Sequence, residues 1–315
     1  MKKLIIYILS VVLMVAFFTS CNTNQGNTDI DENKITVVTT VFPVYDWTRN
    51  VAGDRCNIIY LDESGTDMHS FEPTANDIIT ISKADVFIHI GGVSDKWVDS
   101  TLSASDNKDI RVLSLIDVTG MLEEETVDGM QIHEHEEDAT EYDEHIWLSL
   151  KKAVIATDEI CSVLSEADKA NSSFYKSNAD SYKNKLLELD KKYSDCVNNA
   201  KRKTLLFADR FPFRYLTEDY GIEYFAAFPG CSAESEASFD TLASLIDKTK
   251  NLSLPCILTI ENSQVNIAET IRKQTGAEIL SLNSCQSVTK SDIESGLTYL
   301  SAMENNLKTI SEALN

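Results

Sequence analysis

Two histidines stand in contexts that are typical of metal ligands. His69 lies in the run GTDMHSFEP over residues 65–73, and His145 lies in DEHIWLS over residues 143–149. Imidazole is the commonest protein ligand for a borderline transition metal. Either histidine alone would be read as a surface or core residue. Because the chain has only five histidines, two such contexts together predict that His69 and His145 bind a metal ion.

A second pair of histidines lies in a strongly acidic segment. Residues 123–144 hold eleven acidic side chains together with His133 and His135, and they show no apolar period. One interpretation is a solvated, disordered loop. The other is an auxiliary metal loop, in which clustered carboxylates raise the local concentration of cations and the two histidines add a weak, exposed site.

The composition narrows the classes of partner. The chain has 28 basic against 50 acidic residues, a net charge of −22, which argues against nucleic acid as a ligand. An acidic surface suits a protein that collects cations, and it also serves solubility. Beyond Cys21 no two cysteines form a CxxC pair, so we do not predict zinc ligands among them, and their disulfide pairing stays open. These residues are Cys56, Cys161, Cys196, Cys231, Cys256 and Cys285.

The first twenty residues read as a targeting segment. Two lysines precede an almost wholly apolar run over residues 4–18, which is the length of a signal-peptide core and is short for a membrane span. The run ends in Thr19-Ser20-Cys21, which resembles the lipobox of bacterial lipoproteins and predicts lipidation of Cys21. The alternative is an ordinary cleaved signal with an incidental cysteine. Residues 21–34 are mostly polar and predict a flexible tether.

Strand and helix patterns alternate on both sides of a long helical segment. Short apolar runs of the kind found in parallel sheets predict strands at 35–40, 57–61, 85–90 and 111–115, then at 204–208, 223–227, 256–260 and 278–282. Helices are predicted at 45–52, 76–82, 241–250, 267–275 and 296–314. Residues 150–202 hold no Pro or Gly and predict one or two long linking helices.

This order predicts an α/β fold with two parallel-sheet lobes, at 35–149 and 203–315, joined by a long rigid backbone helix. A cleft between two such lobes, lined by the carboxyl ends of strands, is the expected ligand site.

The chain resembles the metal-binding lipoproteins of ABC importers, the zinc and manganese solute-binding family, nearly from end to end. The matching segments are TTVFPVYD at 39–46, GTDMHSFEPT at 65–74, ADVFI at 84–88 with Trp97, DEHIWL at 143–148 and YLSAMENNL at 299–307. The resemblance implies two lobes, a connecting helix, and a metal in the cleft with ligands from each lobe. His69 and His145 match its two N-terminal ligands.

The resemblance implies two further ligands from the second lobe. Members place a histidine or carboxylate at the end of that lobe's first strand, where this chain has Asp209. Asp209 could instead pair with Arg210 or cap the next helix. The fourth ligand, often Asp, comes from near residues 282–286, which hold no carboxylate. We expect Glu234 to take this place. The alternatives are water, Asn283, Glu236 or Glu261.

Two imidazoles and a carboxylate suit Zn²⁺ and also Mn²⁺. The loop with His133 and His135 favours zinc, because some zinc-importing members carry such a loop. We therefore expect an extracytoplasmic, membrane-anchored monomer that delivers a metal ion to an ABC permease. Zinc is the favoured metal, and manganese is the second choice. A zinc hydrolase is the competing class, but the chain has no HExxH or G-x-S-x-G motif, so we do not expect an enzyme. An adhesin-like surface lipoprotein is the third class.

Overall fold

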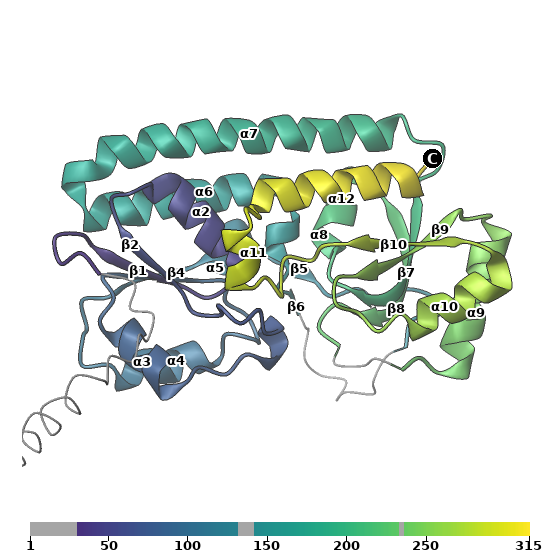
Figure 1. Ribbon diagram of the computed structural model, residues 1–315, viewed down its shortest axis with the longest axis horizontal. Coiled ribbons are helices and arrows are strands. Elements are labelled where there is room, and N and C mark those ends of the chain that lie inside the picture. Colours follow the sequence, from purple (N-terminus) through teal and green to yellow (C-terminus); the bar gives the residue numbers. More distant parts are fainter. Residues whose placement is uncertain (1–29, 132–141, 233–235) are drawn as a thin grey trace, which may run out of the picture. The chain divides into compact units, whose positions relative to one another are not determined.

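Two parallel four-stranded sheets form the two lobes of this computed structural model, which describes residues 30–131, 142–232 and 236–315 (Figure 1). The strands of the first sheet, in the order β2-β1-β3-β4, are β1 (Thr36–Thr39), β2 (Asn57–Tyr60), β3 (Val86–His89) and β4 (Arg111–Ser114). Those of the second, in the order β10-β9-β7-β8, are β7 (Thr204–Phe211), β8 (Glu223–Pro229), β9 (Cys256–Ile260) and β10 (Glu278–Leu282). In each sheet the first strand lies between the second and the third, so the two lobes share one topology. Residues 34–315 belong to a single unit.

Apolar side chains on both faces of each sheet explain why the central strands β1, β3, β7 and β9 are buried. In β1, Val37 and Val38 are both fully buried but belong to different core clusters, because successive side chains point to opposite faces. In β7, Leu205 and Leu206 divide in the same way. Near-continuous apolar runs are expected for parallel strands that helices cover on both sides.

Helices cover both faces of each sheet (Figure 1). The first sheet lies between α2 (Phe42–Ala52) with α6 (Leu150–Ala167) and α3 (Ala75–Ser82) with α4 (Trp97–Ala104). The second lies between α8 (Arg214–Tyr220) with α12 (Tyr299–Ala313) and α9 (Phe239–Asn251) with α10 (Asn266–Thr275). The shorter elements are η1 (Met68–Ser70), α5 (Leu115–Thr119), the antiparallel pair β5 (Leu122–Glu123) and β6 (Tyr142–Asp143), η2 (Ile146–Leu148), η3 (Lys169–Asn171) and α11 (Lys290–Glu294).

The long helix α7 (Ser172–Asn198) runs beside both lobes (Figure 1). Its 27 residues give a length of about 40 Å. In the first lobe Asn178 donates to the main-chain O of Val51 at 3.0 Å, and toward the second lobe the Tyr193 hydroxyl donates to the main-chain O of Met303 at 2.7 Å. Because α7 packs along α6, which leads out of the first lobe, the pair forms the connection between the sheets.

The predicted fold class is confirmed, and the differences lie at element ends, in short helices and in the short strand pair of β5 and β6. Helix α2 begins at Phe42, three residues before the predicted start, because Pro43 is accommodated in a first turn that needs no N–H donor. Strand β7 continues to Phe211 rather than ending at residue 208. The helices α4, α5, α8 and α11 were not predicted. The segment 150–202 holds α6, η3 and α7.

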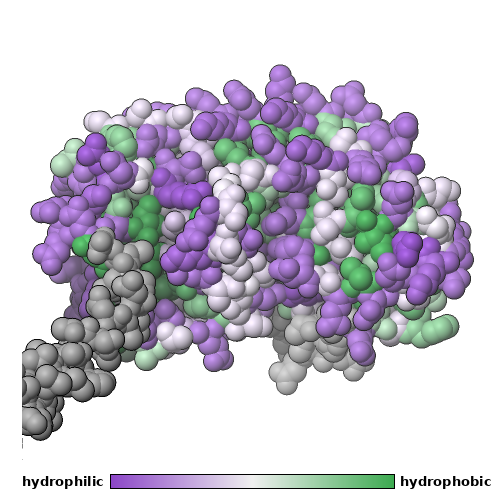
Figure 2. All heavy atoms as spheres, viewed as in Figure 1, coloured by the Kyte–Doolittle hydropathy of each residue, from purple (hydrophilic) through white to green (hydrophobic). Residues whose placement is uncertain are grey.

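Hydrophilic side chains dominate the face seen in Figure 2, including the region over α7, and apolar residues show as scattered patches. No helix among the described residues is long and apolar enough to span a bilayer.

Candidate metal site between the lobes

His69 is positioned by the loop that follows β2. The 3₁₀ helix η1 begins after Asp67, whose carboxylate accepts a hydrogen bond from the His69 main-chain N–H at 3.1 Å. On the ring, Nδ1 lies 2.9 Å from the hydroxyl of Ser94, which belongs to the loop after β3. His69 is therefore held by hydrogen bonds at its main-chain N–H and at Nδ1 of its ring. Its Nε2 atom is the one that remains to bind a ligand.

His145 is positioned by the residue two places before it. Asp143 accepts hydrogen bonds on one carboxylate oxygen from the main-chain N–H of His145 at 2.7 Å and from its Nδ1 at 3.0 Å. The histidine is completely buried, and its ring packs edge-on against Trp147 at a centroid distance of 5.2 Å. A carboxylate that takes the Nδ1 proton fixes the tautomer and leaves the Nε2 lone pair for a metal.

Glu144 joins the two histidine segments. Its carboxylate accepts hydrogen bonds from the main-chain N–H groups of Val93 and Ser94. Gly92 has a φ of +84°, and a Cβ there would lie 2.8 Å from the Glu144 carboxyl group. Glycine is therefore required for this close approach. Since Ser94 also contacts the ring of His69, Glu144 helps to fix the distance between the two histidines.

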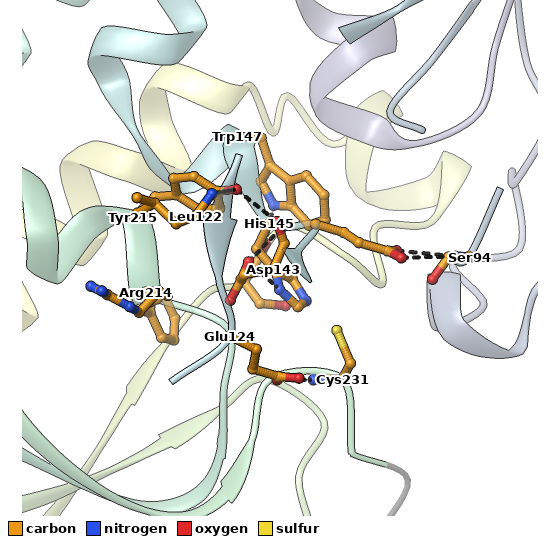
Figure 3. A network of polar contacts seen from close by, with 12 residues as sticks. Ser94, Leu122, Glu124, Asp143, His145, Trp147, Arg214, Tyr215 and Cys231 are labelled. Carbon is orange, nitrogen blue, oxygen red and sulfur yellow. Dashed lines mark hydrogen bonds and ion pairs between the residues drawn. The ribbon is translucent and has the colours of Figure 1, made fainter. Parts of the chain in front are cut away.

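The two imidazoles face each other, and one cysteine lies beside them. Nε2 of His69 is 3.2 Å from Nε2 of His145. In the part of the chain that the structure describes, one group of potential metal ligands forms, from His69, His145 and Cys231, and their ligand atoms all lie within 4.8 Å of one another. Figure 3 shows the Cys231 sulfur on the side of His145. The sequence analysis predicted no cysteine ligand, whereas the structure places the Cys231 sulfur next to the two imidazoles.

Burial and the neighbouring carboxylates set the protonation of these groups. Burial, followed by the positive potential of His145, lowers the pKa of His69 to about 4. Burial also disfavours charge on His145, but the carboxylates of Asp143, Glu144 and Glu124 together outweigh it and raise the pKa of His145. Burial and then the carboxylate of Glu124 raise the pKa of the Cys231 thiol, although a hydrogen bond from the Glu144 main-chain N–H opposes this. Burial thus favours the neutral forms of His69 and Cys231, whereas the neighbouring carboxylates make His145 more basic.

An ion pair crosses between the lobes next to this group. Nη2 of Arg210, in β7, lies 2.7 Å from the carboxylate of Asp67, in the loop that carries His69. The guanidinium also donates to the main-chain O of Ser232 at 3.4 Å. Burial acts to raise the pKa of Asp67, but the charge and hydrogen bond of Arg210, together with His69, outweigh it and lower the pKa. One side chain therefore connects the loop of His69 with the loop of Cys231.

The predicted third ligand, Asp209, is not brought to the imidazoles. Its carboxylate accepts hydrogen bonds from the main-chain N–H of Arg210 at 2.8 Å and of Ile260 at 3.1 Å. It lines an adjacent interlobe cavity of about 360 Å³ and is absent from the group of His69, His145 and Cys231. Asp209 was placed by a likeness in sequence, and the register irregularity in β7 between Phe207 and Arg210 shows why that placement is sensitive to one residue.

The alternative ligands have other partners as well. Glu261 accepts hydrogen bonds from both the main-chain N–H and the hydroxyl of Ser284, each at 2.6 Å. Asn283 uses its side-chain oxygen to accept from the Cys285 main-chain N–H at 2.7 Å. Neither belongs to the group of three ligand atoms. Cys21, His133, His135 and Glu234 lie outside the described residues.

Sequence reasoning missed Cys231, yet a signal for it exists. Cys231 follows β8, the second strand of the second sheet, just as His69 follows β2, the second strand of the first. Gly230 precedes it, and a Cβ at Gly230 would lie 2.8 Å from the main-chain O of Phe211 and 3.1 Å from the ring of His145. A glycine followed by a ligand-type residue at the carboxyl end of a strand is the pattern to look for.

Two lobes of one topology, a rigid connecting helix pair and a potential metal site at the lobe junction define a two-lobed metal-binding protein. Residues 37–313 match the family model of the periplasmic zinc-uptake complex component A. The chain belongs to this family. Members are binding components of uptake systems, which places the chain with binding proteins rather than with enzymes.

The similar proteins are described as zinc-binding or zinc-uptake proteins. The zinc-binding lipoprotein AdcA of Streptococcus pneumoniae (strain R6) is 33% identical over 99% of this chain, and the match covers 61% of AdcA. The high-affinity zinc uptake system protein ZnuA of Bacillus subtilis is 26% identical over 98% of this chain and 97% of ZnuA. The crystal structure of the Zn(II)-bound ZnuA-like domain of S. pneumoniae AdcA superposes with a TM-score of 0.74 at 31% identity, covering 89% of this chain and 99% of that domain. The chain thus spans about three fifths of AdcA.

Proposed function

We propose that this protein captures a divalent transition metal, zinc before manganese, between its lobes and delivers it to an ABC permease. The observation that carries the proposal is the pair of Nε2 atoms of His69 and His145, 3.2 Å apart. Two nitrogen ligands at about 2.05 Å from a tetrahedral zinc ion lie about 3.4 Å apart. The pair already has nearly this separation, so a zinc ion fits with little movement of either ring.

The surrounding groups support metal binding over a purely structural role. The hydrogen-bond partners of both rings, Ser94 and Asp143, engage Nδ1 and direct Nε2 toward the other ring. The two Nε2 atoms are each other's hydrogen-bond partners at 3.2 Å, and a metal ion bound to both would replace the single proton that this contact holds. The zinc-binding names of the similar proteins point to zinc as the first choice of cargo.

Calorimetry on the metal-stripped protein tests the proposal. We expect one Zn²⁺ to bind per chain, and His69→Ala and His145→Ala each to weaken binding by at least about 100-fold, or about 2.7 kcal/mol. His89→Gln is the matched control, because His89 is also buried and paired with a carboxylate, Asp95, but lies outside the group. Near-unchanged affinity in both alanine variants would contradict the proposal.

The N-terminal segment supports a proposal for where the protein is located. We propose that the mature chain begins at a lipidated Cys21, lies outside the cytoplasm and acts as a monomer held at the membrane. The support is the apolar run over residues 4–18 followed by Ser20-Cys21. Cys21→Ser should release the protein from the membrane fraction or stop its processing. A mature N-terminus other than Cys21, found by mass spectrometry, would contradict lipidation.

The acidic segment at 123–144 serves capture rather than affinity. Its acidic side chains other than the buried Asp143 and Glu144 attract cations, and His133 and His135 add a weak auxiliary site. Replacing residues 126–141 by a short Gly-Ser link should slow zinc uptake at low salt and change the equilibrium affinity only a few-fold. The slowing should fade with salt, because exposed charges are screened beyond about 10 Å at 0.1 M ionic strength. A large loss of affinity would make His133 or His135 a ligand of the main site.

A further inference from the structure

A cysteine on the second lobe completes the group that the two histidines of the first lobe begin. Cys231 lies in the turn after β8, whereas His69 and His145 follow β2 and β6. Both lobes thus contribute to one cluster of ligand-type atoms, all within 4.8 Å of one another. Cys231 is one of six cysteines in the described residues, all of them free, and the other five take no part in this cluster.

We propose that the Cys231 thiolate is the third metal ligand of this cleft, so that the site is a His₂Cys zinc site that rejects manganese. The inference rests on the proposed function, because it names the ligand that closes the same site. Thiolate is a soft ligand that Zn²⁺ accepts readily, whereas Mn²⁺ prefers carboxylate, carbonyl and water oxygens.

The distances fit such a site. With zinc–nitrogen bonds of about 2.05 Å and a zinc–sulfur bond of about 2.3 Å, a tetrahedral ion places nitrogen and sulfur about 3.6 Å apart. The sulfur lies no more than 4.8 Å from the ring nitrogens, so it needs to approach by roughly 1.2 Å at most. A change in the side-chain torsion of Cys231 supplies a movement of this size.

The loop that carries Cys231 is held against His145 by several contacts. Gly230 allows the main chain to lie against the ring, since a Cβ would come within 3.1 Å of it. The Cys231 main-chain N–H donates to Glu124 at 3.4 Å, and Figure 3 shows Glu124 beside the cysteine. On the next residue, the main-chain O of Ser232 accepts from Arg210. The cysteine is therefore presented to the imidazoles by a fixed turn.

The Arg210–Asp67 ion pair explains why the third ligand is not on β7. Arg210 lies at the carboxyl end of that strand, where it pairs with Asp67 at 2.7 Å. A cation at that position cannot bind a metal ion, but it draws the loop of His69 toward the loop of Cys231. The charge of the three ligands is then −1 with a thiolate, which partly neutralises Zn²⁺ in a buried site.

Replacing zinc with cobalt gives a direct spectroscopic test of whether the Cys231 sulfur binds the metal. The metal-stripped full chain loaded with Co²⁺ should show the intense near-ultraviolet charge-transfer absorption of a cobalt–thiolate bond and the visible bands of a tetrahedral site. Cys231→Ser should abolish the charge-transfer absorption and weaken Zn²⁺ binding by about 10- to 1,000-fold. Cys196→Ser, on α7, is the control and should leave both unchanged.

A second variant covers a folding defect, and the outcomes separate the two proposals. Cys231→Asp keeps a ligand but exchanges sulfur for oxygen, so it should lose the charge-transfer absorption and narrow the ratio of Zn²⁺ to Mn²⁺ affinity by at least about tenfold. Charge-transfer absorption that survives in a folded Cys231 variant would overturn the inference. Absent absorption in the wild type, with zinc binding that still needs His69, would overturn it and leave the proposed function standing. No metal binding at all would overturn both.

Discussion

Asp143→Asn is the substitution that best isolates how the second histidine is prepared for metal. One oxygen of Asp143 accepts from both the main chain and Nδ1 of His145, and the carboxylate is only 2% exposed. An amide oxygen can still accept both bonds, but the negative charge that makes the ring a better donor to a cation is lost. The amide also brings two N–H donors into a buried place where the neighbouring groups of His145 are themselves N–H donors.

The size of the effect follows from this arrangement. Loss of such a partner of a metal-binding histidine weakens metal affinity by about 10- to 100-fold, or about 1.4–2.7 kcal/mol. We expect Asp143→Asn to lie in this range, because the ring and its position are kept while the charge is removed. The measurement is a competition titration of the stripped protein against a zinc chelator of known affinity.

A matched control is available in the same lobe. Asp95 accepts from Nδ1 of His89 at 3.1 Å and from the Gly91 main-chain N–H at 2.8 Å, so it repeats the contacts of Asp143 outside the group of metal ligands. Asp95→Asn should lower the melting temperature while changing zinc affinity by less than a few-fold. Equal affinities of Asp143→Asn and wild type would refute the reasoning. So would equal losses of affinity in the two variants.

Three other substitutions have defined outcomes. Ser94→Ala removes a neutral partner of His69 at 2.9 Å, so chelator competition should show a loss below about tenfold, and a larger loss than in Asp143→Asn would contradict this ranking. Gly230→Ala places a Cβ 2.8 Å from the main-chain O of Phe211, so thermal or urea unfolding should show a loss of about 1–3 kcal/mol together with weaker zinc binding. Unchanged stability would mean that the turn relaxes freely. Tyr299→Phe leaves a buried main-chain O without its 2.6 Å donor. Unfolding should show a cost of about 1–3 kcal/mol with little effect on affinity, and a large loss of affinity would contradict a purely structural role.

The parts of the fold that the sequence predicts are those with strong local signals. The central strands β1, β3, β7 and β9 are buried on both faces, and their short runs of β-branched and apolar residues identify parallel strands. The segment around α7 contains no helix breaker and repeats apolar residues every three or four positions. Short helices such as α5, with five residues, hold too few turns to show a period.

The residues of the site also divide into those with a local sequence signal and those without one. His69 and His145 are recognisable because their positioning groups, Asp67 and Asp143, stand two residues before each of them. Cys231 is not recognisable in this way, because His145, its neighbour in space, lies 86 residues (231 − 145) earlier in the chain. Asp209, the predicted third ligand, lies outside the group of His69, His145 and Cys231, and the sequence hides the cause in a similar way. Its carboxylate is engaged by the main-chain N–H of Ile260, a contact across 51 residues that no local pattern reveals.

The most direct test of the account is the position of the metal itself. Crystals of the zinc-loaded protein, measured on both sides of the zinc absorption edge, locate the ion by anomalous scattering. We predict one strong peak between the lobes, at about 2.0–2.1 Å from Nε2 of both His69 and His145. A peak elsewhere in the chain, with no zinc between these two rings, would contradict the central claim that the two histidines hold the cargo.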